Sequence, residues 1–143
     1  MIRPIIFGAL LWGATFYALR RGGTDERIAA VGMFANAYLT LLVVKPLATR
    51  FTHIELPIML VDFGLLVLLL WLALRSNRFW PLWLAAMQFL ATFAHFAPYV
   101  PHIIPWGYGS AVALWMYPML IVVTVASHGA HEERKRHGSL LNK

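Results

Sequence analysis

The chain has 143 residues, of which 60% are hydrophobic and 13% are charged, and its formal net charge is +6. Soluble globular domains are about 45–50% apolar and about 25% charged, so a soluble fold of this length could not hide so much apolar surface, whereas a bilayer can. The absence of cysteine excludes disulfides, thiol catalysis, iron–sulfur clusters and cysteine-ligated zinc. We therefore predict one all-α domain that lies in a membrane, and we expect no cofactor.

Five apolar stretches predict transmembrane helices, because a helix needs about 20 mostly apolar residues to cross a bilayer. In chain order they cover residues 2–19, 28–44, 57–74, 82–100 and 111–127. The connections are short, and the last runs from Pro101 to Ser110. We expect Thr24 or Asp25 to cap the second helix and Pro118 to kink the fifth. An alternative has four spans, with the first stretch lying flat at the membrane interface.

The positions of Lys and Arg predict the orientation, because cytoplasmic loops carry an excess of these residues. With the C-terminus inside, nine basic residues fall on the inner side, namely Arg20, Arg21, Arg27, Arg75, Arg78, Arg134, Lys135, Arg136 and Lys143. Three fall on the outer side, namely Arg3, Lys45 and Arg50. We therefore expect a multi-pass membrane protein with its N-terminus outside and its C-terminus in the cytoplasm. The basic residues would meet lipid headgroups rather than nucleic acid.

Asp62 and His95 are the main candidates for a functional site. Asp62 lies about five residues, or roughly 8 Å, inside the outer end of the third predicted helix, and His95 lies at the same expected depth in the fourth. A charged side chain at such a position usually faces the bundle interior and has a partner, so the two can form a pair. The alternative is that Asp62 reaches the membrane interface, or that both residues only hold helices together.

Further polar residues fall on single helix faces. Gln88, Thr92, His95 and Tyr99 follow the helical period on the fourth helix, and Asn36 and Thr40 are one turn apart on the second. Tyr117 belongs to a similar line on the fifth helix. Lipid cannot satisfy these groups, so we expect the three faces to converge on the interior. They would act either as interhelical hydrogen bonds or as the lining of a small hydrated cavity.

The remaining polar segment is residues 128–143, which we expect to be a solvated basic tail on the cytoplasmic side. No acidic or cysteine framework of a metal site surrounds its histidines, His128, His131 and His137. Haem bound between helices usually has two axial histidines, whereas only His95 lies inside a predicted span. The motifs of serine hydrolases, zinc proteases, P-loop enzymes and dinucleotide-binding enzymes are also missing, so we do not expect an enzyme.

Several segments resemble a known group of proteins. They are Arg21-Gly22-Gly23, Asp25-Glu26-Arg27-Ile28, Arg78-Phe79-Trp80-Pro81-Leu82-Trp83, His95-Phe96 and Ala113-Leu114-Trp115-Met116-Tyr117-Pro118. With these the chain is similar to small multi-pass inner-membrane proteins that are widespread in alphaproteobacteria, and the resemblance implies a helical membrane fold but no particular activity.

Three functions are compatible with these features. The first is a non-enzymatic accessory or scaffold subunit of a larger membrane complex, which the small-residue pair Ala9 and Gly13 on the first helix would help to dock. The second is a small proton-linked transporter or carrier that uses Asp62 and His95. The third and weakest is pigment or haem binding through His95.

Overall fold

A computed structural model describes residues 2–43, 56–99, 101–102 and 105–141. Within these ranges the secondary structure is helical, without strands, which confirms the all-α prediction. The elements are α1 (Ile2–Arg21), α2 (Thr24–Val43), α3 (Leu56–Arg75), α4 (Trp80–Phe93), the 3₁₀-helix η2 (Ala94–Tyr99) and α5 (Pro105–Leu141). Each predicted span corresponds to one of the α-helices. Residues 44 and 100, which end two predicted spans, and the basic residues Lys45 and Arg50 lie outside the described residues.

Two helix boundaries differ from the prediction. The α-helical part of the fourth span stops at Phe93 and continues as the 3₁₀-helix η2, because Pro98 has no backbone N–H for an α-helical bond. The fifth helix starts at Pro105 rather than after Ser110, and it runs for 37 residues through Pro118 to Leu141. The predicted boundary between a span ending at 127 and a separate tail is therefore absent from the backbone, which stays helical across it.

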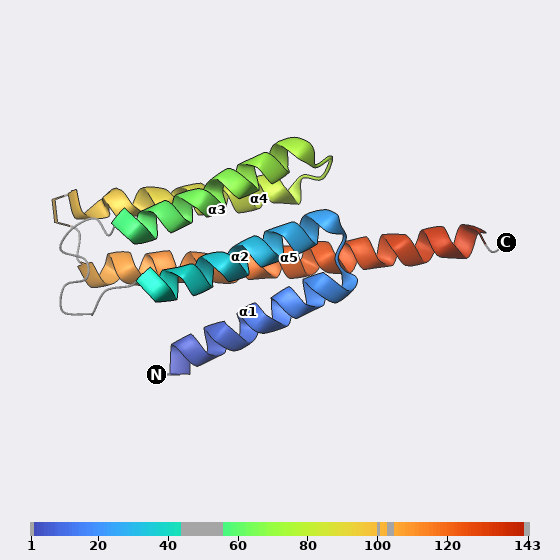
Figure 1. Ribbon diagram of the computed structural model, residues 1–143, viewed down its shortest axis with the longest axis horizontal. Coiled ribbons are helices and arrows are strands. Elements are labelled where there is room, and N and C mark those ends of the chain that lie inside the picture. The colour runs from blue at the N-terminus through green and yellow to red at the C-terminus, as the bar shows by residue number, and fades with distance from the viewer. Residues whose placement is uncertain (1, 44–55, 100, 103–104, 142–143) are drawn as a thin grey trace.

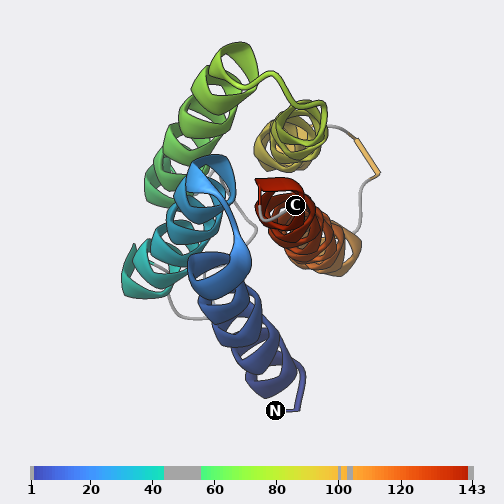
Figure 2. The ribbon, with the colours of Figure 1, turned by 90° about the vertical axis from the view of Figure 1, so that its right-hand side faces the viewer.

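The helices form a closed ring in which each packs against the next along the chain. Helix α5 returns to pack along α1, and it also contacts α2 across the ring. Figure 1 shows the helices running along a common long axis, with the C-terminal part of α5 projecting beyond the others, and Figure 2 shows the ring from one end. Because α1 packs against both α2 and α5, the structure favours five bundled helices over four plus one interfacial segment.

The outer surface of the bundle is apolar, unlike that of a soluble protein. It carries large exposed apolar side chains, among them Trp12, Phe16, Leu41, Phe63, Leu74 and Phe93. Its interior holds small and medium apolar residues such as Ala18, Ala29, Met33, Leu69 and Leu84 together with buried polar ones. In the described residues, the helices α1, α2 and α3 are long and apolar enough to cross a membrane. The protein is therefore a membrane protein.

Gly22 lies where the turn between α1 and α2 meets α5. Its N–H donates to the carbonyl of Ala18 at 2.8 Å. A Cβ on Gly22 would lie 2.5 Å from that carbonyl oxygen, 2.8 Å from the Cβ of Glu26 and 3.2 Å from the Oγ of Ser127. Only a residue without a side chain lets these three helices approach so closely.

We expect Gly22→Ala to destabilise the protein by about 1–3 kcal/mol, because the new methyl group meets backbone rather than a flexible side chain. Thermal unfolding in detergent would measure the loss as a lower Tm. Gly13→Ala is the matched control, since a Cβ there meets nothing within 4 Å. Equal Tm values for the two variants would contradict the close packing at Gly22.

Candidate functional site

Asp62 and His95 form a buried pair near one end of the bundle. The Oδ2 atom of Asp62 in α3 lies 2.7 Å from Nε2 of His95 in η2. Asp62 is 7% exposed and His95 is 5% exposed, so both are shielded from the surroundings of the bundle. The predicted contact is confirmed, and Asp62 faces the interior of the bundle rather than its outer surface. The contact is compatible with an imidazolium beside a carboxylate. It is equally compatible with a neutral imidazole whose Nε2–H donates to the carboxylate.

Two amide side chains complete the surroundings of Asp62. The Nδ2 group of Asn36 in α2 donates to Oδ1 of Asp62 at 3.0 Å. The Nε2 group of Gln88 in α4 donates to the backbone carbonyl of Asp62 at 3.1 Å. Both donors are buried, Asn36 to 5% exposure and Gln88 to 1%. The carboxylate thus receives a hydrogen bond on one oxygen and the imidazole on the other, and these contacts tie α2, α3 and α4 together at one level.

The change of helix type places His95. It is the second residue of η2, just beyond the end of α4 at Phe93. A 3₁₀-helix has three residues per turn, whereas an α-helix has 3.6. The side chains after Phe93 therefore point in directions that differ from those in a continued α-helix. Phe93 and Phe96 face outward, whereas His95 between them is buried. Short 3₁₀ segments within helices often occur at functional positions.

The structure brings together most, but not all, of the predicted site residues. Thr92 is buried beside the pair, but its hydroxyl donates to the carbonyl of Gln88 at 2.8 Å, within its own helix. Thr40 follows Asn36 on α2, and its Oγ1 atom is buried without a hydrogen-bond partner. Tyr117 instead packs edge-on against Phe7 of α1, with ring centroids 5.6 Å apart. The converging helices are therefore α2, α3 and α4, and the predicted share of α5 through Tyr117 is wrong.

A second polar cluster, which the sequence analysis missed, holds the opposite end of the bundle. We call this the arginine-rich end, because the two turns that lie there are flanked by Arg20, Arg21, Arg27, Arg75 and Arg78. Glu26 of α2 is only 2% exposed, and its Oε2 atom accepts from the N–H of Gly23 at 2.9 Å. This bond is one half of a capping box, which needs a Glu three residues after the cap. That spacing in the sequence was the signal for it.

The same cluster links the two turns. Ser76 donates from Oγ to Oδ2 of Asp25 at 2.7 Å, which joins the turn after α3 to the start of α2. Thr24 and Asp25 lie in the first turn of α2, and the N-cap position is Gly23, so the expectation that Thr24 or Asp25 caps this helix is corrected. Arg78 approaches Glu26 to 3.9 Å and also pairs with Glu133 of α5.

The start of the predicted basic tail is docked on the bundle rather than free in solvent. His128 forms a hydrogen bond with the hydroxyl of Tyr17 at 3.0 Å, and His131 contacts Arg21. Arg134 donates to the carbonyl oxygens of Arg21 and Gly22, which end α1 and would otherwise lack helical partners. Partial desolvation of the ring, and then the positive charge of Arg21, lower the pKa of His131 from its ordinary value of 6.5. Only the residues after about 135 extend freely.

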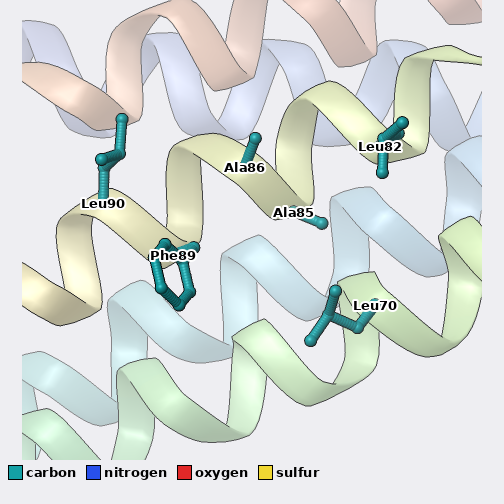
Figure 3. Close-up of a pocket in the computed structure, with 6 residues that line it drawn as sticks. All are labelled: Leu70, Leu82, Ala85, Ala86, Phe89 and Leu90. Atoms are coloured by element: carbon teal, nitrogen blue, oxygen red, sulfur yellow. The ribbon is translucent and has the colours of Figure 1, made fainter.

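Two hollows on the surface lie away from the Asp62–His95 pair. One, of about 390 Å³, lies between α3 and α4. Figure 3 shows the apolar side chains that line it, which are Leu70, Leu82, Ala85, Ala86, Phe89 and Leu90. A second hollow, of about 350 Å³, lies at the arginine-rich end beside Glu26 and Arg78. Among the described residues no three His, Asp or Glu side chains converge as a transition-metal centre requires. An axial bond from His95 to haem or pigment through Nε2 would have to displace Asp62.

Comparisons with protein-family models, with curated proteins and with solved structures find no match. The functional argument therefore depends on the geometry of the buried pair and its neighbours.

We expect the Asp62–His95 pair to show energetic coupling. The losses in the free energy of unfolding caused by Asp62→Asn and by His95→Gln should add up to more than the loss in the double variant. Each single change leaves one partner buried without its counterpart, whereas the double change does not. The coupling should be on the order of 0.5–3 kcal/mol in a double-mutant cycle measured by thermal unfolding in detergent at neutral pH. Strictly additive effects would mean that the contact contributes nothing to folding.

Proposed function

We propose that this chain is a five-span protein of the bacterial inner membrane in which Asp62 and His95 bind a proton that is exchanged during the transport of a small solute. The observation that carries the proposal is the 2.7 Å contact between a buried carboxylate and a buried imidazole. Ionisable groups are costly inside a membrane, and where they occur they commonly belong to ion pathways or proton relays. Imidazole is also the side chain whose charge most readily changes near neutral pH.

The surroundings of the pair suit a group that gains and loses a proton. Asn36 can keep its hydrogen bond to Asp62 in either state of the imidazole, so the carboxylate stays in place. Gln88 holds the backbone at the same residue. A proton on His95 gives a neutral ion pair, and its loss leaves one negative charge on Asp62. The site thus changes its net charge by one unit without needing to change its framework of three helices.

Lengths and charges support five spans and an orientation. The 14 residues of α4 and the six of η2 together extend about 33 Å, close to the roughly 30 Å thickness of the hydrocarbon layer. Helix α5, with 37 residues, is about 55 Å long and so extends well beyond one face of the layer. The positive-inside rule assigns the arginine-rich end to the cytoplasm, which puts the Asp62–His95 pair in the outer half of the membrane.

Reporter fusions test this orientation. A reporter joined after Lys143 should be active on the cytoplasmic side, and one inserted after Gly107 should be active on the outer side, because the basic residues gather at the other end of the bundle. Alkaline phosphatase and green fluorescent protein fusions would give complementary signals. The reverse pattern at both positions would overturn the proposed orientation.

Proton-linked transport is testable in vesicles that contain the purified protein and an acidic interior, monitored with a fluorescent pH-gradient dye. Addition of monovalent cations, amines or amino acids in turn should collapse the gradient for at least one class of solute. Asp62→Asn and His95→Gln should reduce that response to the level of protein-free vesicles, because neither variant has the complete proton-binding pair. Glu132→Gln is the control, since this carboxylate is in the tail and pairs with Lys135.

An accessory subunit is the second candidate, and the free end of α5 favours it. Residues after about 135 are exposed and lie beyond the other helices, where they could contact another protein (Figure 1). The small-residue pair on α1 also remains open, because a Cβ on Gly13 would meet nothing within 4 Å. Identical gradient traces for the unmodified protein and Asp62→Asn, across all solutes, would overturn the transport proposal and leave this alternative.

A further inference from the structure

Two buried side-chain oxygen atoms of α2 lack hydrogen-bond partners, and one of them belongs to the residue that donates to Asp62. They are Oδ1 of Asn36 and Oγ1 of Thr40. A buried polar atom left unpaired costs about 1–3 kcal/mol, so native proteins rarely keep one unless water, an ion or a ligand occupies the adjoining space. Asn36 is 5% exposed, and the Nδ2 atom of its side-chain amide already donates to Asp62. The side-chain oxygen Oδ1 is therefore the atom that remains available.

Thr40 differs from three other hydroxyl residues of the helices. The hydroxyls of Thr92, Thr124 and Ser127 each donate to the carbonyl four residues earlier, at 2.7–2.8 Å. This is the usual way in which a helix satisfies such a group. The hydroxyl of Thr40 makes no such bond and is nevertheless buried. Because Asn36 and Thr40 are four residues apart on α2, their side chains share one face of the helix.

We propose that the carbonyl oxygen of Asn36, the hydroxyl oxygen of Thr40 and the carboxylate of Asp62 form a binding site for a small monovalent metal cation of the sodium type. Hard cations bind to oxygen atoms of carboxylates, carbonyls, hydroxyls and water. Each carboxylate oxygen has two acceptor positions, so Asp62 can bind a cation while it keeps its bond from Asn36. One carboxylate balances one positive charge, which favours a monovalent over a divalent ion.

A cation at this site would lie against the buried carboxylate of Asp62 and offset its negative charge. The described polar residues at this level of α2 and α4, namely Asn36, Thr40, Gln88 and Thr92, are uncharged, and Tyr117 of α5 faces α1 instead. The inference rests on the proposed function, because it makes this cation the solute exchanged for the proton.

Binding is measured separately from transport by thermal unfolding of the full chain in dodecyl maltoside. The Tm should be higher in sodium chloride than in choline chloride at equal ionic strength. It should also rise with the logarithm of the sodium chloride concentration, as expected for a ligand that binds the folded state. Equal Tm values in the two salts would overturn the inference and leave water as the occupant.

Thr40→Val is the decisive variant, because it removes the hydroxyl oxygen while the shape of the side chain is kept. It should abolish the sodium-dependent rise in Tm, whereas Thr40→Ser, which restores an oxygen, should recover it. Thr124→Val is the matched control and should respond to sodium as the unmodified protein does, because its hydroxyl is used within its own helix. A sodium response that persists in Thr40→Val would overturn the assignment.

The two proposals fail in different ways. Proton-linked transport of some other solute, together with a Tm that is indifferent to sodium, would overturn the cation site and leave the proposed function. A sodium-dependent Tm that Thr40→Val removes, together with gradient traces unaffected by Asp62→Asn, would leave the cation site and overturn proton-linked transport.

Discussion

The carboxylate of Asp62 lies among helices whose outer surfaces are aliphatic and aromatic, and an isolated charge there would be far more costly than any single apolar contact is favourable. The helices can pack only if they bring donors to it. Asn36 of α2 and His95 of η2 contact the carboxylate itself, and Gln88 of α4 donates to the backbone carbonyl of the same residue, so these contacts fix the relative height of three helices. Apolar contacts in a bilayer cannot set that register, because they gain little over contacts with lipid.

The two ends of the bundle are held by different means. Near Asp62 the bonds are buried and connect helix faces, whereas at the arginine-rich end they connect turns and helix termini. Arg78 lies between Glu26 and Glu133, and Arg134 reaches the last carbonyls of α1, so α5 is attached to both turns. Gly22 lets α1, α2 and α5 approach closely at this point. These contacts hold the helices together at the arginine-rich end. A change in charge would therefore have most effect at the opposite end, which contains the 3₁₀ segment.

Helical periodicity and rise predicted much of the bundle and of its buried pair. Asp62 and His95 were matched by depth, since 1.5 Å per residue converts sequence position into height, and Gln88 was placed by its spacing from His95. Periodicity gives the face of a helix but not which helix it meets, which is why Tyr117 was assigned to the wrong neighbour. The contacts of Ser76 and Arg134 depend on which turns lie side by side, and the positions of polar residues in the sequence give no such information.

The continuity of α5 has a mechanical consequence. Because one helix runs from Pro105 to Leu141, the described chain has no flexible joint between the bundle and the charged residues at its far end. The six residues 136–141 lie beyond the docking contacts of Arg134 and form a helical arm of about 9 Å, so a tilt of α5 by about 10° would move the tip of this arm sideways by about 1.5 Å. Any tilt of α5 is therefore carried to this end of the helix without an intervening hinge.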